Sequence, residues 1–242
     1  MNAIEIAERA VLCALFRRYP DGLVWIGGSV LQLLYDSPRA SYDLDLCPSG
    51  EMPPAEEVRA AVREALEQVN ATSGSRLIVD EFAVQPGLVR LKVTEGGELR
   101  FMVDLTLVAG QIRDAAAVVV ESVLGPQAVR VATDSRLLML KLEALLFRRF
   151  LKPADVFDVW FLLSRGVRLK PNQRAWLSDQ VRMREMERAD VKARFAKLTP
   201  ERFLADLKKR MAHEAFHRWN PAGAQQAIRA ALNVVRKEIE WP

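Results

Sequence analysis

Two aspartates separated by a single residue are the first side chains in this sequence that could do chemistry together. Asp43 and Asp45 lie in the alternating run Tyr42 to Cys47. Because successive side chains of a β-strand point to opposite faces, both carboxylates are expected on one face, close enough to share a divalent cation. Asp104 lies in a later apolar strand, where an uncompensated charge would be costly. The three carboxylates predict a site for phosphoryl transfer from a nucleoside triphosphate, with Mg²⁺ or Mn²⁺ neutralising the phosphates.

A glycine turn before the first aspartate adds a candidate phosphate cradle. Gly27 and Gly28 follow the apolar strand 23–26, and Ser29 opens a predicted helix, 29–35, which its hydroxyl could cap. Exposed N–H groups at such a turn, with the positive end of the helix dipole, favour a phosphate. Alternating acids on an exposed strand and a glycine pair before a helix are also ordinary features, so each needs the other.

Basic and acidic residues recur further along the chain at helical spacing. Lys141 and Arg148 are seven residues apart and share a helix face, from which both could reach one triphosphate. Asp155 and Asp158 follow on a helix predicted to begin at Pro153. The alternative is a pair of solvent-facing bases and an acid placed in a first helical turn by the helix dipole.

Hydrophobic periodicity predicts the elements that must position these side chains. Helices are predicted at 4–18, 29–35, 55–69, 135–150 and 153–164, and strands at 23–26, 42–47, 77–84, 88–93 and 99–107. Glu95, Gly96 and Gly97 predict a hairpin between the last two strands. We therefore expect an α+β fold, in which a nucleotidyltransferase-type mixed β-sheet with flanking helices (residues 1–133) is followed by an all-helical C-terminal domain (134–242).

Composition is that of an ordinary folded protein. Half of the 242 residues are hydrophobic and 27% are charged, enough to bury a core. The two cysteines, Cys13 and Cys47, lie in apolar patterns and form neither a disulfide framework nor a metal knuckle. No signal peptide or membrane span is apparent, and a cytoplasmic location is expected.

The charge is unevenly distributed along the chain. Residues 1–164 hold 17 Lys and Arg against 22 Asp and Glu, a net charge of −5, whereas residues 165–242 hold 18 against 9, a net charge of +9. Such a basic excess is typical of a surface that docks a polyanion, here an acidic acceptor such as tRNA on the helices around 174–194 and 208–218. The alternative is a set of solvated, arginine-rich helices.

Two motifs in this order resemble those of the AbiEii/AbiGii toxin family, within the DNA polymerase β nucleotidyltransferase superfamily. The first is Gly-Gly-Ser, a helix, Arg-x-Ser and Asp-x-Asp; the second is Lys, Arg and Asp-x-x-Asp. Their members here are Gly27, Gly28, Ser29, Arg39, Ser41, Asp43 and Asp45, then Lys141, Arg148, Asp155 and Asp158. The family more often has a basic residue where this chain has Ala154, and Lys152 is a candidate substitute. The resemblance covers about residues 20–165.

The resemblance implies a Mg²⁺-dependent nucleotidyltransferase that moves a nucleoside monophosphate from an NTP to tRNA or protein, with release of pyrophosphate. It implies the toxin of a toxin–antitoxin or abortive-infection system, with a cognate antitoxin as a possible partner and a helical region closing over the nucleotide. The implied metal ligands are Asp43, Asp45 and Asp104, with Asp104 also as base. The implied nucleotide-binding residues are Gly27, Gly28, Ser29, Arg39, Ser41, Lys141 (also catalytic), Arg148, Asp155 and Asp158.

A competing motif lies near the C-terminus. His213, Glu214 and His217 satisfy H-E-x-x-H, which on a helix could bind zinc in a metallohydrolase, with Glu238 as a third ligand. A further alternative is a non-catalytic nucleic-acid-binding protein of the same fold. The complete set of three aspartates argues against that second alternative.

Overall fold

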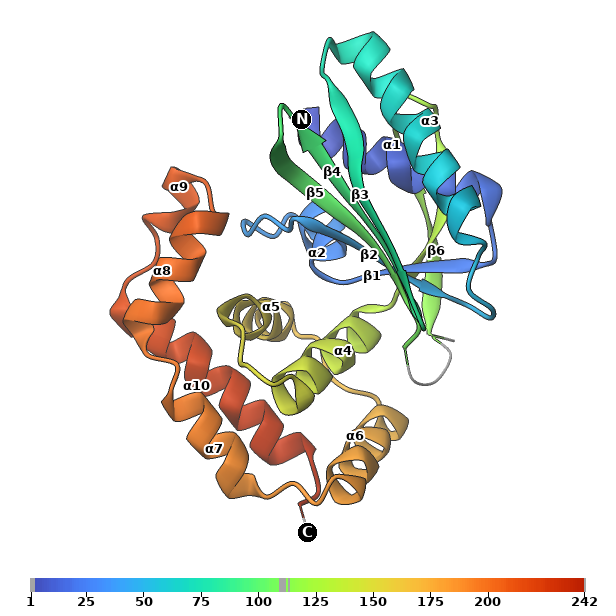
Figure 1. Cartoon of the computed structure of the whole chain (residues 1–242). Coiled ribbons are helices and arrows are strands. Elements are labelled where there is room, and N and C mark those ends of the chain that lie inside the picture. Colours follow the sequence, from blue (N-terminus) through green and yellow to red (C-terminus); the bar gives the residue numbers. More distant parts are fainter. Residues whose placement is uncertain (1–2, 109–111, 113, 242) are drawn as a thin grey trace. The chain divides into compact units, whose positions relative to one another are not determined.

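The hydrophobic runs of the N-terminal half form a seven-stranded mixed β-sheet (Figure 1). The strands are β1 (Leu23–Ile26), β2 (Asp43–Pro48), β3 (Leu77–Gln85), β4 (Leu88–Glu95), β5 (Glu98–Thr106), β6 (Ala115–Val120) and β7 (Gln127–Ala132). Their order across the sheet is β3-β4-β5-β2-β1-β7-β6, with β2 parallel to β5, β1 parallel to β7 and the other pairs antiparallel. The mixed sheet predicted from the sequence is confirmed.

Strands β6 and β7 were not predicted. The sequence of β6 is three alanines followed by three valines, which gives no alternation of hydrophobic and polar residues. In β7 only Val129 and Val131 alternate with polar or small residues, too short a run to predict a strand. Strand β6 pairs with β7, the next strand along the chain, and β7 joins the sheet by pairing with the distant β1.

The computed structural model describes residues 3–108, 112 and 114–241, and these divide into two units. Unit 1 comprises Met1–Tyr35 and Ser41–Thr133, and unit 2 comprises Asp36–Ala40 and Asp134–Pro242. Within the described ranges, no helix is long and apolar enough to cross a membrane.

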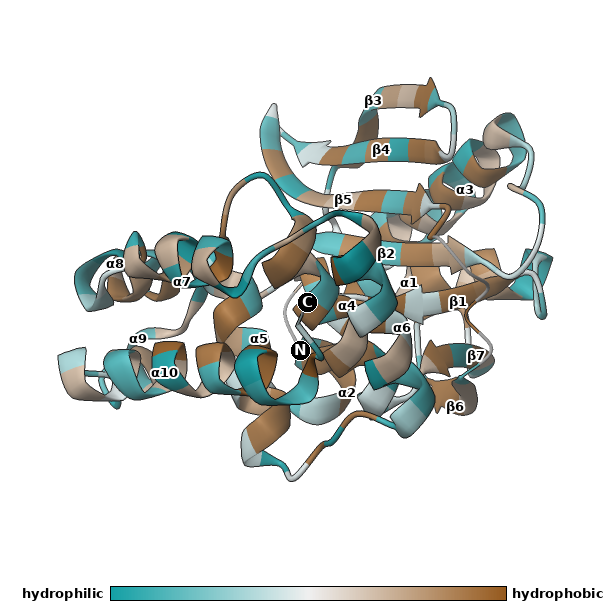
Figure 2. Cartoon of the chain, turned by 90° about the horizontal axis from the view of Figure 1, so that it is seen from below, coloured by the Kyte–Doolittle hydropathy of each residue, from teal (hydrophilic) through white to brown (hydrophobic). Residues whose placement is uncertain are grey.

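Helices cover one face of the sheet in unit 1. Helices α1 (Ala3–Arg18) and α3 (Ala55–Ser73) lie side by side against it, and α2 (Gly28–Tyr35) connects β1 to the segment before β2 (Figure 1). Hydrophobic and hydrophilic residues alternate along β4 and β5 (Figure 2). Leu91 and Val103, opposite one another on these strands, are fully buried. The opposite face of the same strands is therefore left for charged residues.

Unit 2 is helical throughout its described elements, as the sequence predicted. They are α4 (Asp134–Phe147), α5 (Pro153–Ser164), α6 (Pro171–Met183), α7 (Arg188–Ala196), α8 (Pro200–Arg210), α9 (His213–Phe216) and α10 (Pro221–Glu238). Pro153 begins α5 as expected. Helix α4 stops at Phe147, three residues before the predicted end, and the guanidinium of Arg194 donates to the carbonyls of Leu146 and Arg148. These end carbonyls are thus satisfied from outside the helix.

The segment Asp36–Ala40, which the sequence had assigned to the first domain, belongs to unit 2. The N–H of Ala40 donates to the carbonyl of Arg210 at 2.6 Å, and Arg39 forms an isolated β-bridge with Met211. Arg39 is also paired with Asp158 inside the helical unit. Asp158 and Met211 are more than a hundred residues away from Arg39 in sequence, which is why local patterns did not reveal these two contacts.

Glu8 is a buried carboxyl group on the helix that backs the sheet. It is 1% exposed, and neither carboxyl oxygen makes a hydrogen bond. Burial raises the pKa of Glu8 from 4.5 to about 8; the charges of Glu5 and Asp43 act in the same direction, and Arg9 opposes them. Glu8 is therefore mostly protonated at neutral pH.

We expect Glu8→Gln to remove a pH dependence of stability. Because the pKa of Glu8 is higher in the folded state than in the unfolded state, protonated Glu8 contributes to stability below pH 4.5. This contribution is lost as the pH rises towards 8. The free energy of unfolding of the variant should therefore exceed that of the parent increasingly over this range, by up to about 4 kcal/mol. Urea unfolding between pH 5 and 8.5 measures the difference, with Glu67→Gln on the exposed side of α3 as control. Parallel pH profiles for parent and variant would contradict the shifted pKa.

Candidate active site

A row of charged side chains crosses three neighbouring strands of unit 1 on the face opposite α1 and α3. Asp45 of β2 is the register partner of Asp104 on β5, and Asp104 is in turn opposite Arg90 on β4. Asp43 points from the same face as Asp45, two residues away on β2. The structure thus brings together on one sheet face the three aspartates that the sequence singled out.

Gly27 makes room for the carboxylate of Asp45. Its φ of +87° is in the left-handed region that favours glycine. A Cβ atom at this position would lie 2.1 Å from Oδ2 of Asp45 and 2.9 Å from the Asp45 Cβ. The glycine predicted as part of a phosphate cradle is therefore required for the position of an acidic side chain; its contact with phosphate remains a prediction.

Asp104 is engaged by an arginine that sequence reasoning missed. The Nε and Nη2 atoms of Arg90 donate to Oδ1 and Oδ2 of Asp104 at 2.8 and 2.5 Å. This bidentate hydrogen bonding raises the pKa of the Arg90 guanidinium, although partial burial opposes it. A β-bulge between Val93 and Thr94 sets the register that places Arg90 opposite Asp104. The hairpin signal alone, counted without a bulge, pairs Arg90 with Val103.

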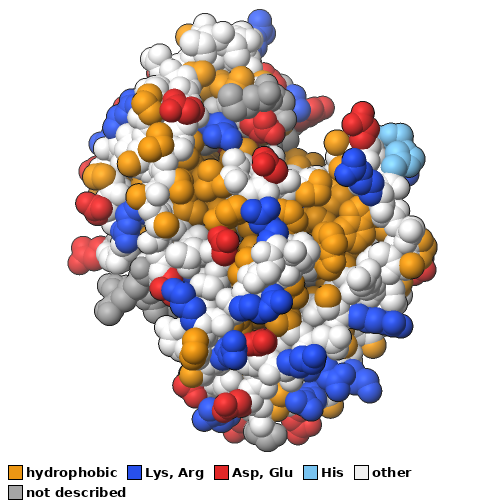
Figure 3. Space-filling model, turned by 180° about the vertical axis from the view of Figure 1, so that it is seen from behind, with side chains coloured by type: hydrophobic (Ala, Val, Ile, Leu, Met, Phe, Trp, Pro, Cys, Tyr) orange, Lys and Arg blue, Asp and Glu red, His pale blue; other side chains and the backbone are white. Residues whose placement is uncertain are grey.

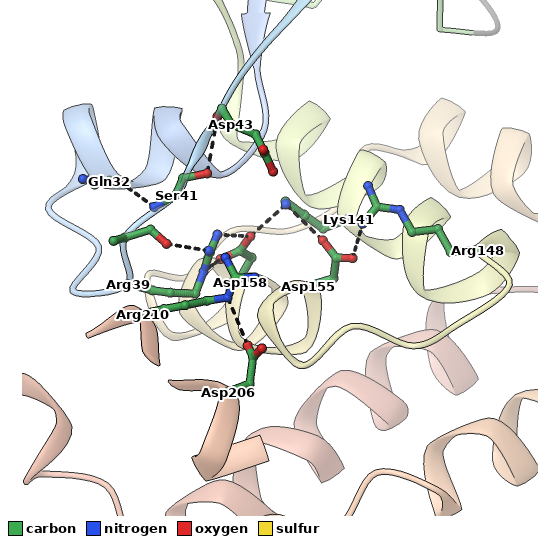
Figure 4. A network of polar contacts seen from close by, with 11 residues as sticks. Gln32, Arg39, Ser41, Asp43, Lys141, Arg148, Asp155, Asp158, Asp206 and Arg210 are labelled. Carbon is green, nitrogen blue, oxygen red and sulfur yellow. Dashed lines mark hydrogen bonds and ion pairs between the residues drawn. The ribbon is translucent and has the colours of Figure 1, made fainter. Parts of the chain in front are cut away.

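Main-chain contacts fix the start of the strand that carries Asp43 (Figure 4). The N–H of Ser41 donates to Oε1 of Gln32 at 2.6 Å, and its hydroxyl donates to the carbonyl of Asp43 at 3.4 Å. Ser41 is 8% exposed, so its observed role is to position β2. Gln32 is a further residue that the sequence did not single out; its place on α2 gave no signal of this contact.

The hydroxyl of Ser29 is buried against an indole and does not cap helix α2. Helix α2 begins at Gly28, one residue earlier than predicted, and Ser29 is fully buried. Its Oγ accepts a hydrogen bond from the indole Nε1 of Trp25 at 3.0 Å. The capping role expected of this hydroxyl is therefore wrong, because Ser29 lies inside helix α2. Its contact with a phosphate stays a prediction.

The carboxylates of Asp43 and Asp45 fit a Mg²⁺ ion. Oδ1 of Asp43 is buried without a hydrogen-bond partner, and buried polar atoms of this kind require a partner such as an ion. Among the described residues, no three or more His, Cys, Asp or Glu side chains are gathered as a metal site, and Asp104 faces Arg90. Mg²⁺ commonly uses one or two carboxylates together with substrate phosphates and water, which agrees with a two-aspartate site.

A second cluster of charges lies inside unit 2 (Figure 4). Lys141 contacts Asp155 at 3.1 Å and Asp158 at 2.8 Å. Nη1 of Arg148 contacts the other oxygen of Asp155 at 2.5 Å, and Nε and Nη2 of Arg39 donate to both oxygens of Asp158 at 2.8 and 2.9 Å. The four residues of the second predicted motif are thus assembled with Arg39.

Burial makes the electrostatics of this cluster strong. Burial alone would raise the pKa of Asp158, but Arg39 and Lys141 lower it below the ordinary value. Burial likewise lowers the pKa of Lys141, yet Asp158 and Asp155 raise it overall. Three cations and two carboxylates leave a net charge of +1. Of the three cations, Arg148 is the most accessible, with a side chain 48% exposed against 13% for Lys141 and 4% for Arg39.

The H-E-x-x-H sequence does not form the zinc site considered above. Nε2 of His213 lies 2.9 Å from Nε2 of His217, but α9 is a single turn of four residues. Glu238, the proposed third ligand, is paired with Arg174 at 2.6 Å. It also lies at the far end of α10, about 25 Å along that helix from its start. Together with the lack of any three-residue ligand group in the described ranges, this excludes the predicted ligand set.

Comparison with known proteins identifies relatives of both the sequence and the fold. A family model described as "Nucleotidyl transferase AbiEii toxin, Type IV TA system" matches residues 11–233. The crystal structure of JHP933 from Helicobacter pylori is 15% identical, with a TM-score of 0.55 over 96% of this chain and 90% of the other. That of a candidate nucleotidyltransferase from H. pylori is 15% identical, with a TM-score of 0.59 over 98% and 94%. No curated protein sequence matches the chain. At this identity the two structures establish the fold alone.

We expect Gly27→Ala to reduce nucleotidyl transfer by about 100-fold or more, because the new methyl group would displace the Asp45 carboxylate. Gly97→Ala is the matched control: its φ is +81°, and a Cβ there meets nothing within 4 Å. Both variants carry the backbone strain of a left-handed alanine, about 1–2 kcal/mol. Activity assays with a thermal-unfolding measurement separate strain from the clash. Equal activities of the two variants would show that Asp45 tolerates the displacement.

Proposed function

Because the chain belongs to the AbiEii family of nucleotidyl transferase toxins, we propose that it transfers a nucleoside monophosphate from an NTP to an RNA acceptor in a Mg²⁺-dependent reaction. The observation that carries the Mg²⁺ and site assignment is the placement of Asp43, Asp45 and Asp104 on one sheet face. Gly27 leaves space for the Asp45 carboxylate, and one buried oxygen of Asp43 has no hydrogen-bond partner. An ordinary exposed acidic strand would need neither feature. Both features suit a cation site.

The proposed reaction is an in-line displacement at the α-phosphorus. A hydroxyl oxygen of the acceptor forms the new P–O bond, and the bond from the α-phosphorus to the bridging oxygen breaks. Pyrophosphate leaves with that electron pair. Asp104 takes the hydroxyl proton in this scheme, which requires it to exchange part of its contact with Arg90. The Arg90 side chain is 45% exposed, so its guanidinium can turn towards a phosphate.

Asp43 and Asp45 would hold Mg²⁺, which when bound neutralises the triphosphate and the charge that develops on the leaving oxygens. Ser41 and Gln32 hold the start of β2, and with it Asp43. Gly27 leaves the space that the Asp45 carboxylate occupies. These contacts preorganise the carboxylates before substrate arrives, so that little reorganisation remains to be done in the reaction.

The charged cluster of unit 2 favours phosphate binding through its one well-exposed cation, Arg148. Its net charge of +1 and the exposure of Arg148 favour an anion, and Arg148 is the cation best placed for direct contact. Lys141 is held between Asp155 and Asp158, and Arg39 is buried against Asp158. We therefore assign Arg39 and the two aspartates a positioning role, and Lys141 a supporting positive charge.

We further propose that the protein is the toxin of a toxin–antitoxin system with a cognate antitoxin, and that its acceptor is RNA, most simply tRNA. The family description supports the first part. The acceptor class follows from the net charge of +9 in residues 165–242, many of whose Lys and Arg side chains are exposed. Lys208 and Lys209 on α8 are two such residues.

We expect Asp43→Asn and Asp45→Asn each to reduce transfer by about a thousandfold or more while the fold persists, because an amide cannot replace a charged metal ligand. The assay follows incorporation of labelled nucleotide from each of the four NTPs into total tRNA, with and without Mg²⁺. Asp80→Asn, on the exposed part of β3, is the control. Retention of most activity by both variants would overturn the site.

RNA binding should weaken steeply with salt, because Lys and Arg side chains displace counterions from phosphates. We expect a log–log slope of roughly −3 to −6, and a smaller slope for the NTP. Lys208→Glu with Lys209→Glu should weaken RNA binding and spare NTP binding. Arg63→Glu with Arg76→Glu, both exposed in unit 1, changes the net charge equally and serves as control. A flat salt profile for RNA would point to a protein acceptor.

A further inference from the structure

Unit 2 contains a pocket of about 540 Å³ that the motifs do not explain. Aromatic side chains of Trp160 and Phe161 on α5 and of Trp219, just before α10, form its walls. Arg218 and Gln226 add polar groups. Hydrophobic side chains gather at the surface beside the pale-blue histidines (Figure 3). This volume is in the range of sites for single small ligands.

The aromatic walls are held by buried neighbours. The rings of Trp160 and Trp219 meet edge to face, with centroids 4.8 Å apart. Trp219 also contacts Phe157 at 5.6 Å and Phe203 at 5.7 Å, both fully buried. Trp160, Phe161 and Trp219 themselves remain partly exposed. The pocket therefore offers aromatic surface whose orientation is fixed before any ligand binds.

Two arginines lie close to these rings. Arg218 lines the pocket, and the guanidinium of Arg165 lies 5.6 Å from the centroid of the Phe161 ring. Glu214 is the one acid among the described lining residues. Trp219, Arg218 and Gln226 of the lining belong to residues 165–242, which carry the net charge of +9, whereas Trp160 and Phe161 precede that range. Rigid aromatic faces beside cations are the arrangement that binds unpaired nucleotides, by stacking on the base and attraction to the phosphate.

We propose that this pocket binds one unpaired nucleotide of the RNA acceptor. The base stacks against Trp160 and Phe161, and Arg218 contacts the adjoining phosphate. The amide of Gln226 and the carboxylate of Glu214 are available to the base edge. The assignment rests on the proposed RNA acceptor and adds a site to it. Basic helices alone would bind any RNA by its charge, whereas this pocket selects RNA with an exposed, unstacked base.

The test measures binding of a fluorescein-labelled hexaadenylate by anisotropy, in the absence of NTP and Mg²⁺. A six-residue abasic ribose phosphate of equal charge separates stacking from electrostatics. The variants are Trp160→Leu and Phe161→Leu, and the control is Phe150→Leu, an aromatic residue of unit 2 that is 67% exposed and does not line the pocket. We expect the first two to bind hexaadenylate about 5- to 100-fold more weakly. The control should bind as the parent does.

The parent should bind the abasic oligomer more weakly than it binds hexaadenylate. The affinity for the abasic oligomer should be the same for the parent and for Trp160→Leu. Equal binding of hexaadenylate by parent, Trp160→Leu and Phe161→Leu would overturn the proposal, as would equal affinity of the parent for the two oligomers. If Trp160→Leu fails to fold by circular dichroism, Phe161→Leu and the pair Arg218→Ala and Arg229→Ala decide. Arg229 is exposed on α10 outside the pocket, so only Arg218→Ala should weaken binding.

A negative result in this binding assay can be distinguished from a wrong assignment of the nucleotidyltransferase activity. The binding assay contains no substrate NTP, so a negative result leaves nucleotidyl transfer to be judged from Asp43→Asn and Asp45→Asn. Displacement of hexaadenylate by a neutral apolar peptide at the same affinity would assign the pocket to a protein partner and overturn the proposal. Transfer without RNA binding at the pocket would confine the acceptor contact to the exposed basic side chains.

Discussion

The carboxylates of Asp45 and Asp104 are held at neighbouring positions on one sheet face, and neighbouring groups must offset the repulsion between them. Arg90 offsets it from the next strand through two hydrogen bonds to Asp104. Gly27 leaves the space that the Asp45 carboxylate fills. A divalent cation at Asp43 and Asp45 would reduce the same repulsion from β2, whereas Arg90 reduces it at Asp104.

In unit 2, the charge of a buried carboxylate is neutralised by cations of the same unit. Asp158 is fully buried, and its charge is balanced there by Arg39 and Lys141. Removal of either cation would leave a buried carboxylate without sufficient compensation, which typically costs several kcal/mol. The contrast with unit 1 is informative: Oδ1 of Asp43 lacks a partner, whereas every oxygen of Asp158 has one. The unpartnered oxygen is the one that the proposed cation would contact.

The H-E-x-x-H match shows why a motif needs its structural context. Metal binding by two histidines four residues apart requires a stable helix and a third ligand, and α9 is a single turn. Trp219, close to this motif, has a different role: it packs on Phe157 and Phe203 and forms a wall of the aromatic pocket. In this segment, Trp219 packs in the core and Arg218 lines the pocket. A local sequence pattern draws attention to the two histidines instead.

The sequence by itself determined whatever depends on near neighbours in the chain. Strand alternation placed Asp43 and Asp45 on one face, Gly96 and Gly97 specified the hairpin, and Pro153 marked the start of α5. Tertiary structure decided whatever depends on distant partners. The bulge at Val93 and Thr94 aligned Arg90 with Asp104. The indole N–H of Trp25 donates a hydrogen bond to the hydroxyl oxygen of Ser29. Arg39 joined unit 2 because Asp158, 119 residues away, is its buried partner. Local propensity cannot encode such pairs, because their free energy arises only when the packed elements bring them together.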